Sequence, residues 1–510
     1  MSASALLTDR YSSEIIGTLS CYDRIVITGT IPRACYAQGM TDLLNIHQIR
    51  ILDYAQFAQR LRDQLVENAQ RVASENGLEI DYLSKPRSMR KESRIAEIIS
   101  QRGDHPGLVH IFSVLEPCDS YKPWHNKNTG RTYLKSESGK CLHYYFYFID
   151  EQFGLCYLRV PTYLPCRLQF YCNAHNWLAN QLRGESIDFT QIDNTLVRID
   201  NWARAQALAD AFPVDQLHQG LDAAVARYCP IIQHFETGYH WSVMQIEYAT
   251  DIVFAQAKDL KPLYETLVRT AVHSVKPENV ATFLGRPLDP RFAQELGTDY
   301  HTRIEGTRIK HHMGRVSIKM YDKIGRVLRI ETTANDLSFF KHYRKVEHKD
   351  GSSSMKWAPL PKTIYSMHPL ITIMAAANRR YIEFISSLID PTPGVRTVEK
   401  LSVPVQENQR TYRGFNLFDA KDLAVLHALT RGQFCITGLQ NSTLRQILAG
   451  VSGAQASRIL KRLRLHGLIK RVAKTYKYHL TKLGKTVVIT ALKLRELVVI
   501  PQLAGIQTGQ

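Results

Sequence analysis

Positive charge is concentrated in one part of this chain. Residues 421–510 hold fifteen lysines and arginines against two acids, Asp422 and Glu496, which gives a net charge of +13. The whole chain carries +18, so its first 420 residues contribute only +5. Such a concentration favours a polyanionic partner, with nucleic acid ahead of an anionic membrane surface. The sequence therefore predicts a separate basic module over this segment.

Turn-forming and polar residues separate the basic module from the rest of the chain. Pro391, Pro393 and Gly394 interrupt the preceding pattern, and the stretch VPVQENQRTYRGFN after them is typical of a linker. With 510 residues the chain is also too long for one ordinary hydrophobic core. We expect an α+β protein with an α/β domain over residues 1–135, a β-rich central domain with a helical insert over 136–395, a linker over 396–414 and the basic module over 415–510.

Hydrophobic periodicity supports this division. Strand-like and helix-like segments alternate through residues 20–117, as in an α/β layer. Long strand-like runs follow from Lys140, among them the aromatic run Tyr144–Phe148. This run is either a stacking platform for nucleic-acid bases or the two faces of a buried sheet. The segment 242–256, SVMQIEYATDIVFAQ, is predicted to be a helix.

The basic module contains an ordered series of elements. An amphipathic helix over 419–429 begins with an acidic cap, and a second helix follows over 441–448 with Asn441 or Ser442 as its N-cap. A turn at 451–453 leads to a third helix, in which apolar residues recur at helical spacing. Two short strand candidates joined by a basic turn, and a further helix start, complete the series.

This order, together with the sequence RILKRLRLHGLIKR…KTYKYHLTKLGK, resembles the winged-helix domains of MarR-type and related bacterial DNA-binding proteins. The resemblance implies that the third helix faces the major groove of duplex DNA and that the hairpin reaches phosphates or the minor groove. Winged helices also mediate protein contacts or bind RNA, so RNA and a second copy of the chain stay open as partners. The residues assigned to nucleic-acid binding are Gln455, Ser457, Arg458, Lys461 and Arg462 on the helix, and Lys474, Tyr476 and Lys477 on the hairpin.

A second candidate site lies in the segment 316–333, VSIKMYDKIGRVLRIETT. Charged residues alternate with apolar ones there, on two strand-like segments joined by a turn that contains glycine. Phosphodiester chemistry needs several hard oxygen ligands around one divalent cation. Asp322 and Glu331 are therefore candidate catalytic residues and candidate ligands of Mg²⁺ or Mn²⁺.

Further charged residues extend this candidate site. Glu305, one strand earlier, is the third predicted metal ligand, and Glu247 or Asp251 on the preceding predicted helix are additional candidates. The alternative is a salt-bridged outer face of a hairpin with no catalytic role. The cations expected to bind phosphates at this site are Lys319, Lys323 and Arg329.

The local sequence MYDKIGRVLRIE, within residues 318–331, resembles a pattern in the rolling-circle replication initiators of phages and plasmids. In those enzymes a strand-borne acid helps to bind the metal and a tyrosine elsewhere attacks DNA. The resemblance implies a tyrosine nucleophile, and Tyr381, beside Arg379 and Arg380, is the candidate. The adjacent pair His311 and His312 does not reproduce the His-hydrophobe-His ligand pair of a second lineage of these enzymes.

The whole chain resembles a bacterial family associated with mobile elements, through the segments DRIVITGTIP, QIEYATDIVF and RIKHHMGRVSIKMYDK. This resemblance implies transposition or element replication. Two hypotheses follow: a metal-dependent enzyme that cuts or joins nucleic acid, or a non-catalytic binder such as a regulator or the protein part of a ribonucleoprotein. The start MSASALLTDR lacks the features of a secretory signal and no apolar stretch is long enough to span a membrane, so a cytoplasmic location is expected.

Overall fold

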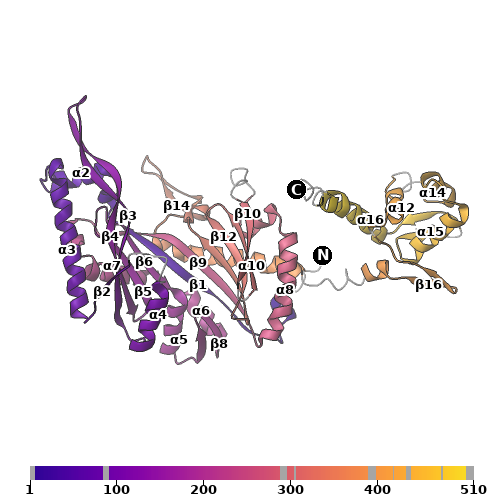
Figure 1. Ribbon diagram of the computed structural model, residues 1–510, viewed down its shortest axis with the longest axis horizontal. Helices are drawn as coiled ribbons and strands as arrows, with labels where there is room; N and C mark the ends of the chain where they lie inside the picture. The colour runs from indigo at the N-terminus through magenta and orange to yellow at the C-terminus, as the bar shows by residue number, and fades with distance from the viewer. Residues whose placement is uncertain are drawn as a thin grey trace. The chain divides into compact units, whose positions relative to one another are not determined.

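The protein is described by a computed structural model, shown in Figure 1. The chain divides into two compact units, Met1–Ile389 (unit 1) and Asp390–Gln510 (unit 2). This division falls six residues before the boundary expected between the central domain and the linker. The residues that the structure describes are 6–83, 91–287, 296–303, 306–388, 398–416, 418–431, 438–472, 475–500 and 503.

Unit 1 is built on one large sheet, which contains eleven strands among the described residues. Its neighbouring strands pair in antiparallel fashion, apart from the parallel pair β2–β3. The expected boundary at residue 135 falls inside β4, so the predicted α/β and central domains are one domain with a shared sheet. In spatial order the strands are β10 (Leu296–Arg303), β11 (Gly306–Met313), β12 (Val316–Lys323), β13 (Val327–Ala334), β9 (His240–Phe254), β1 (Ile15–Thr30), β6 (Leu168–Asn173), β5 (Gly154–Pro161), β4 (Arg131–Asp150), β3 (Gly107–Asn126) and β2 (Ile80–Leu83).

Helices cover the large sheet and two small hairpins are attached to it. On α10, the buried Asn378 donates to the carbonyls of Tyr248 and Ile330 and accepts from Thr332, which fixes this helix against one face of β9 and β13. The helices of unit 1 are α1 (Leu7–Arg10), α2 (Ala37–Ile46), α3 (Tyr54–Glu75), α4 (Lys91–Arg102), α5 (Ala174–Gly184), α6 (Trp202–Asp210), α7 (Val214–Tyr228), α8 (Ala257–Ser274), α9 (Pro277–Phe283) and α10 (Met367–Leu388), and the hairpins are β7 (Phe189–Ile192) with β8 (Thr195–Ile199) and β14 (Lys341–Glu347) with β15 (Ser353–Pro359).

The helix predicted over 242–256 is wrong, because residues 242–254 belong to the central strand β9. Its side chains alternate between the faces of the sheet: Tyr248 and Ile252 lie on the apolar α10 face, and Glu247 and Asp251 lie on the other. Hydrogen bonds to β1 and β13 on both sides, together with burial of both faces, favour the strand over the helix.

The aromatic run Tyr144–Phe148 is buried throughout, so of its two interpretations the structure supports the two faces of a buried sheet and excludes the base-stacking platform. Alternate residues of this run serve the two faces of β4. Phe146 stacks on Tyr228 of α7 with 4.6 Å between ring centroids, whereas Tyr147 packs on Tyr157 of β5. The run therefore builds the core on both sides of the sheet.

Unit 2 contains most of the elements expected of the basic module, around its own apolar core. The side chain of Asp419 caps α12, and Ser452 and Thr481 cap α15 and α16, whereas the N-cap of α14 is Gln440 and not Asn441 or Ser442. The predicted linker contains regular structure, because its residues 405–412 include the paired strands β16 (Val405–Glu407) and β17 (Arg410–Tyr412). The other elements are α12 (Ala420–Leu429), α14 (Asn441–Ile447), α15 (Gly453–Leu465), the paired strands β18 (Ile469–Arg471) and β19 (Tyr478–Leu480), and α16 (Lys482–Leu494), continued by a π-helical turn over Arg495–Val499.

Within the described ranges, no helix combines the length and the apolarity that crossing a bilayer requires.

Candidate functional site

The register of the β12–β13 hairpin decides which of the predicted metal ligands can meet. Lys319 lies opposite Glu331, whereas Asp322 lies opposite Leu328. Directly opposed residues share a face of the sheet and successive residues alternate. Asp322 therefore lies on the α10 face and Glu331 on the other, so the expected pairing of Asp322 with Glu331 around one cation is wrong. The third predicted ligand, Glu305, lies outside the described residues.

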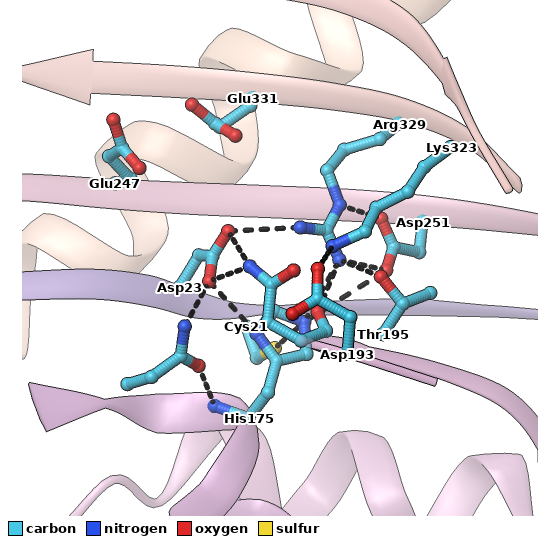
Figure 2. Close-up of polar contacts among 12 residues, drawn as sticks. Cys21, Asp23, His175, Asp193, Thr195, Glu247, Asp251, Lys323, Arg329 and Glu331 are labelled. Atoms are coloured by element: carbon cyan, nitrogen blue, oxygen red, sulfur yellow. Dashed lines mark hydrogen bonds and ion pairs between the residues drawn. The ribbon is translucent and has the colours of Figure 1, made fainter. Parts of the chain in front are cut away.

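Glu331 has two other carboxylates as neighbours on its own face. Glu247 comes from β9 and Asp23 from β1, and one oxygen atom of each of the three side chains lies within 4.8 Å of the other two. Figure 2 shows the three side chains directed toward one another from adjacent strands. They line a polar cavity of about 340 Å³ on this face. Sequence reasoning included Glu247 among its candidates but missed Asp23.

Lys319 lies between two of these carboxylates. Its ammonium group donates to Glu331 Oε1 at 2.5 Å and to Glu247 Oε1 at 3.1 Å, and Tyr321 Oη donates to Glu331 Oε2 at 2.6 Å. Burial and the charge of Glu331 raise the pKa of Glu247. Burial would lower the pKa of Lys319, but Glu331 and Glu247 outweigh it and raise that pKa. Lys319 thus places a positive charge between Glu331 and Glu247, two carboxylates that repel each other.

Arg329 lies beside the carboxylate cluster, two residues before Glu331 on the same face of β13, and is fully buried. Its Nε and Nη2 donate to the two carboxylate oxygens of Asp251 at 2.6 and 2.7 Å, and its Nη1 donates to Asp23 at 2.9 Å. Nη2 also donates to the carbonyl of Asn194 and to the hydroxyl of Thr195, both at 2.9 Å. These bonds occupy the guanidinium, so the predicted contact of Arg329 with phosphate is wrong and its role is to position Asp23.

Side chains from distant parts of the chain complete the surroundings of Asp23. The amides of Asn173 and Asn194 donate to its carboxylate at 2.6 and 2.7 Å, and His175 Nδ1 lies 3.4 Å from it. On the far side of the ring, His175 Nε2 lies 3.3 Å from Cys21 Sγ. Burial would lower the pKa of His175, but Cys21 and Asp23 raise it to about 10. Burial would raise the pKa of Asp23, but Arg329 and His175 hold it well below the usual range.

Lys323 reaches the rim of the same cavity. Its ammonium group lies 3.1 Å from Asp193 of the β7–β8 turn, as Figure 2 shows. Burial and the nearby Arg329 lower the pKa of Lys323. Together with Lys319 and Arg308, Lys323 gives the cavity three cationic side chains beside its carboxylates. Two of the predicted phosphate-binding cations, Lys319 and Lys323, therefore lie at this site.

The predicted nucleophile Tyr381 is not at this site. It lies on α10, against the opposite face of the sheet, and it is fully buried. Its hydroxyl lies 3.3 Å from His311 Nε2, and its ring packs edge-on against Phe283. A buried phenol on the other side of the sheet cannot attack a phosphate bound in the cavity that Glu331 lines, so the structure does not assemble the covalent mechanism.

In unit 2, one of the predicted DNA-binding residues has a structural role. Arg462 donates to both carboxylate oxygens of Asp422 at 2.6 and 2.8 Å and to the carbonyls of Arg413 and Gly414. Its guanidinium also lies 3.9 Å from the ring centre of Phe415. Arg462 is only 9 % exposed, so the predicted base contact of this residue is wrong.

The other α15 residues predicted to contact DNA are more exposed than Arg462, and three of them form hydrogen bonds or an ion pair within unit 2. Gln455 Oε1 accepts from the Ser452 amide at 2.8 Å and so caps its own helix, and Ser457 accepts from Asn441. Lys461 is paired with Glu407. Arg458 is exposed on the same helix.

The hairpin residues expected to reach DNA are also exposed. Tyr476 is 80 % exposed, with the Arg471 guanidinium 5.1 Å from its ring centre, and Lys477 is exposed beside it. Lys474 lies outside the described residues. An exposed aromatic ring and cations thus lie together at the tip of this hairpin.

Replacing Arg462 by Ala should destabilise unit 2 by about 1–3 kcal/mol. The cost stays moderate because Asp422 keeps Arg413 and the Asn416 amide as partners. Thermal unfolding should show the loss in the transition of unit 2, and DNA affinity measured well below that transition should be unchanged. If Arg462→Ala instead kept the stability of unit 2 and weakened DNA binding, Arg462 would be a DNA contact and not a structural residue.

The two parts of the molecule thus offer a cavity that joins carboxylates with lysines and, separately, a helix and hairpin with exposed basic residues. Carboxylates that converge from adjacent strands are suited to hold a divalent cation, since Mg²⁺ and Mn²⁺ prefer oxygen ligands. Comparison with known proteins adds nothing to this chemistry: no family model, no curated protein and no solved structure matches the chain.

Proposed function

We propose that this protein binds nucleic acid through unit 2 and cleaves a phosphodiester bond at the cavity of unit 1, with Mg²⁺ or Mn²⁺ held by Asp23, Glu247 and Glu331. The observation that carries the proposal is the approach of three carboxylates to within 4.8 Å of one another, in a chain whose net charge is +18. Three like charges at this separation repel one another, and a divalent cation relieves that repulsion.

The chemistry of the cavity suits hydrolysis of a phosphodiester. A bound divalent cation would polarise the phosphate and lower the pKa of an attacking water. Lys319 would then exchange its carboxylate partners for the phosphate, and Lys323 and Arg308 would attract the nucleic-acid backbone to the cavity. Attack by water breaks the bond between phosphorus and the leaving oxygen, which takes up a proton. Such a mechanism has no need of a tyrosine nucleophile.

The second half of the proposal concerns unit 2, which we take to be a winged helix that binds duplex DNA. Among the residues that the structure describes, the order of α12, α14 and α15, then the β18–β19 hairpin and α16, supports this assignment. The net charge of +13 over residues 421–510 supports it as well. The biological setting that we propose is transposition or replication of a bacterial mobile element.

One observation favours a non-catalytic alternative. Lys319 already bonds two of the three carboxylates, which is the arrangement of a structural ion-pair network. In this alternative both units only hold DNA or RNA, as in a regulator or a ribonucleoprotein. The two functions differ in whether the cavity takes up a cation.

A cleavage assay on the purified full chain distinguishes the two functions. Supercoiled DNA, single-stranded DNA and the nucleic acid that copurifies with the protein are incubated with Mg²⁺, Mn²⁺ or a chelator. We expect cleavage that depends on Mg²⁺ or Mn²⁺ and stops in chelator. Tight binding to all of these nucleic acids without cleavage under any condition would establish the non-catalytic alternative.

Replacing Arg458 by Ala should weaken binding to the preferred DNA sequence by about 1–3 kcal/mol and reduce discrimination among sequences, because a base-edge contact is lost. Binding titrations on the preferred site and on unrelated duplexes measure both effects. Lys485, an exposed cation of α16, provides the control, since Lys485→Ala should leave sequence preference unchanged. Equal weakening of Arg458→Ala on every sequence would identify a phosphate contact instead.

A further inference from the structure

The hairpin of β14 and β15 stands apart from the large sheet and forms a separate two-stranded sheet. Its antiparallel register places Tyr343 opposite Trp357 and Lys345 opposite Met355. Opposed residues share a face, so these four side chains lie together on one side of the hairpin. Lys341, two residues before Tyr343, lies on the same side.

Two large aromatic rings on this face are exposed to solvent. Trp357 is 68 % exposed and Tyr343 is 50 % exposed, with 6.1 Å between their ring centroids. Elsewhere in unit 1, Trp177 and Trp241 are buried in the core. Aromatic rings stabilise a fold chiefly through burial, so these two contribute less than their size allows. Their exposure points to a ligand that covers them.

Positive charge accompanies the exposed rings. Residues 341–362 contain six lysines and arginines against two acids, a net charge of +4. Residues 1–389 together carry only +5, so this hairpin and its flank account for most of the net charge of unit 1. The occupant of the face is therefore expected to be anionic and to present flat apolar surfaces. Single-stranded nucleic acid has both properties.

The hairpin also lies close in the chain to the cavity. It follows β13, which ends at Ala334 beside Val316 at the start of β12. Glu331 precedes Ala334 by three residues, about 10 Å along an extended strand. Figure 1 shows the hairpin, labelled β14, rising beyond this end of the large sheet.

We infer that the face formed by Tyr343 and Trp357 binds a single-stranded segment of nucleic acid, whose bases stack on the two rings while Lys341 and Lys345 pair with its phosphates. Bases within a duplex are already stacked on one another, so exposed rings select unstacked ones. This inference deepens the proposed function. It rests on that function only in one respect, that the bound strand would lead to the cavity where cleavage takes place. Binding itself does not require cleavage.

Tryptophan fluorescence of the full chain provides a direct test. All tryptophans of the chain belong to unit 1, so the basic unit 2 contributes no tryptophan signal even if it binds the same oligonucleotide. Oligothymidylate should quench the fluorescence of the wild type. The quenching should disappear in Trp357→Phe and persist in Trp124→Phe, which removes the exposed tryptophan of the β3–β4 hairpin. Equal quenching in Trp357→Phe and wild type would overturn the inference.

Affinity measurements separate stacking from a merely structural effect. With a labelled oligothymidylate at fixed salt, Trp357→Ala and Tyr343→Ala should each bind about tenfold more weakly, whereas Trp357→Phe, which keeps a ring, should bind almost as well as the wild type. Duplex binding should change little in all three variants. Tyr82→Ala is the control, since Tyr82 is 59 % exposed on the edge strand β2. Equal losses in Tyr82→Ala, or equal losses on single strand and duplex, would overturn stacking at this face.

Other occupants and the cleavage function give distinguishable outcomes. Binding of anionic lipid vesicles through Trp357, without competition by oligothymidylate, would overturn the inference in favour of a membrane surface. Loss of cleavage in Glu331→Gln with normal quenching by oligothymidylate would support single-strand binding at the hairpin, since that binding does not depend on the cavity. Full cleavage in the wild type with no quenching would leave the proposed function standing and remove this inference.

Discussion

Replacing Glu331 by Gln should lower cleavage by orders of magnitude while leaving the affinity for DNA level or slightly higher. Gln keeps the shape of the side chain but removes one of three carboxylate charges from the cation. It also removes one of the two ion pairs of Lys319, whose other partner is Glu247. Cleavage rates at saturating Mg²⁺ and Mn²⁺, with binding measured in parallel, test this expectation.

Two matched variants show whether the effect belongs to the cavity. Glu116 accepts hydrogen bonds from Tyr145 and Arg159 much as Glu331 accepts them from Tyr321 and Lys319, but it lies on β3, outside the cavity. Glu116→Gln should therefore retain cleavage. Asp322→Asn, on the opposite face of the same hairpin as Glu331, should retain it as well. Equal inactivation by Asp322→Asn would mean that the carboxylate cluster is not the site.

Metal binding has a readout that does not depend on activity. A cation at concentration c that binds only the folded protein stabilises it by RT ln(1 + c/Kd), so the melting temperature rises with the logarithm of the cation concentration once that concentration exceeds Kd. Mg²⁺ or Mn²⁺ should therefore raise the melting temperature of unit 1 in the wild type and in Glu116→Gln, but not in Glu331→Gln. An equal rise in all three proteins would place the cation elsewhere.

The sequence predicts the local features of the candidate site better than its assembly. The strands of the β12–β13 hairpin and the Gly-containing turn follow from residues 316–333 alone. The same alternation already separates Asp322 from Lys319, Tyr321 and Lys323, because an even spacing along a strand keeps one face and an odd spacing changes it. A site on one face of this strand can therefore include Asp322, or Lys319 with Lys323, but not both.

The segment 242–256 shows a different difficulty. Its apolar residues fit a helical spacing, yet Glu247 and Asp251 also alternate with Tyr248 and Ile252 at the period of a strand. Pairing with β1 and β13 decides between the two, and those partners are distant in sequence. The local helical pattern of this segment is therefore overridden by its pairing with strands on both sides.

Asp23 could not be found from the sequence by local reasoning. It lies in an apolar strand, where a single acid carries no motif, and the residues that hold it, among them Asn173, His175 and Arg329, are 150 or more positions away. By contrast, the acidic cap Asp419 in unit 2 acts on a residue three positions away and was predicted from the sequence. Sequence reasoning succeeds where the interaction is local and fails where the fold supplies the partner.

Arg329 offers the largest expected effect on stability. Arg329→Met should destabilise unit 1 by about 3–5 kcal/mol, because it leaves Asp23 and Asp251 buried without their shared cation. Burying a carboxylate without its cation costs far more folding free energy than is lost when an exposed ion pair is broken. Arg198, whose partner is Asp200, provides the matched control: both side chains are more than half exposed, so Arg198→Met should cost less than about 1 kcal/mol.

The pH dependence of stability is a second test of the predicted effect of Arg329→Met. Pairing with Arg329 and His175 lowers the pKa of Asp23 in the folded protein, against the effect of burial. The stabilisation from a carboxyl with a lowered folded pKa is present above its unfolded pKa, about 4, and is lost as the pH falls toward the folded value. In Arg329→Met the folded pKa of Asp23 should rise, so the variant should lose most stability near neutral pH and approach the wild type in acid. Denaturant titrations of unit 1 at several pH values should show this convergence, and a constant difference at every pH would mean that the loss comes from packing alone.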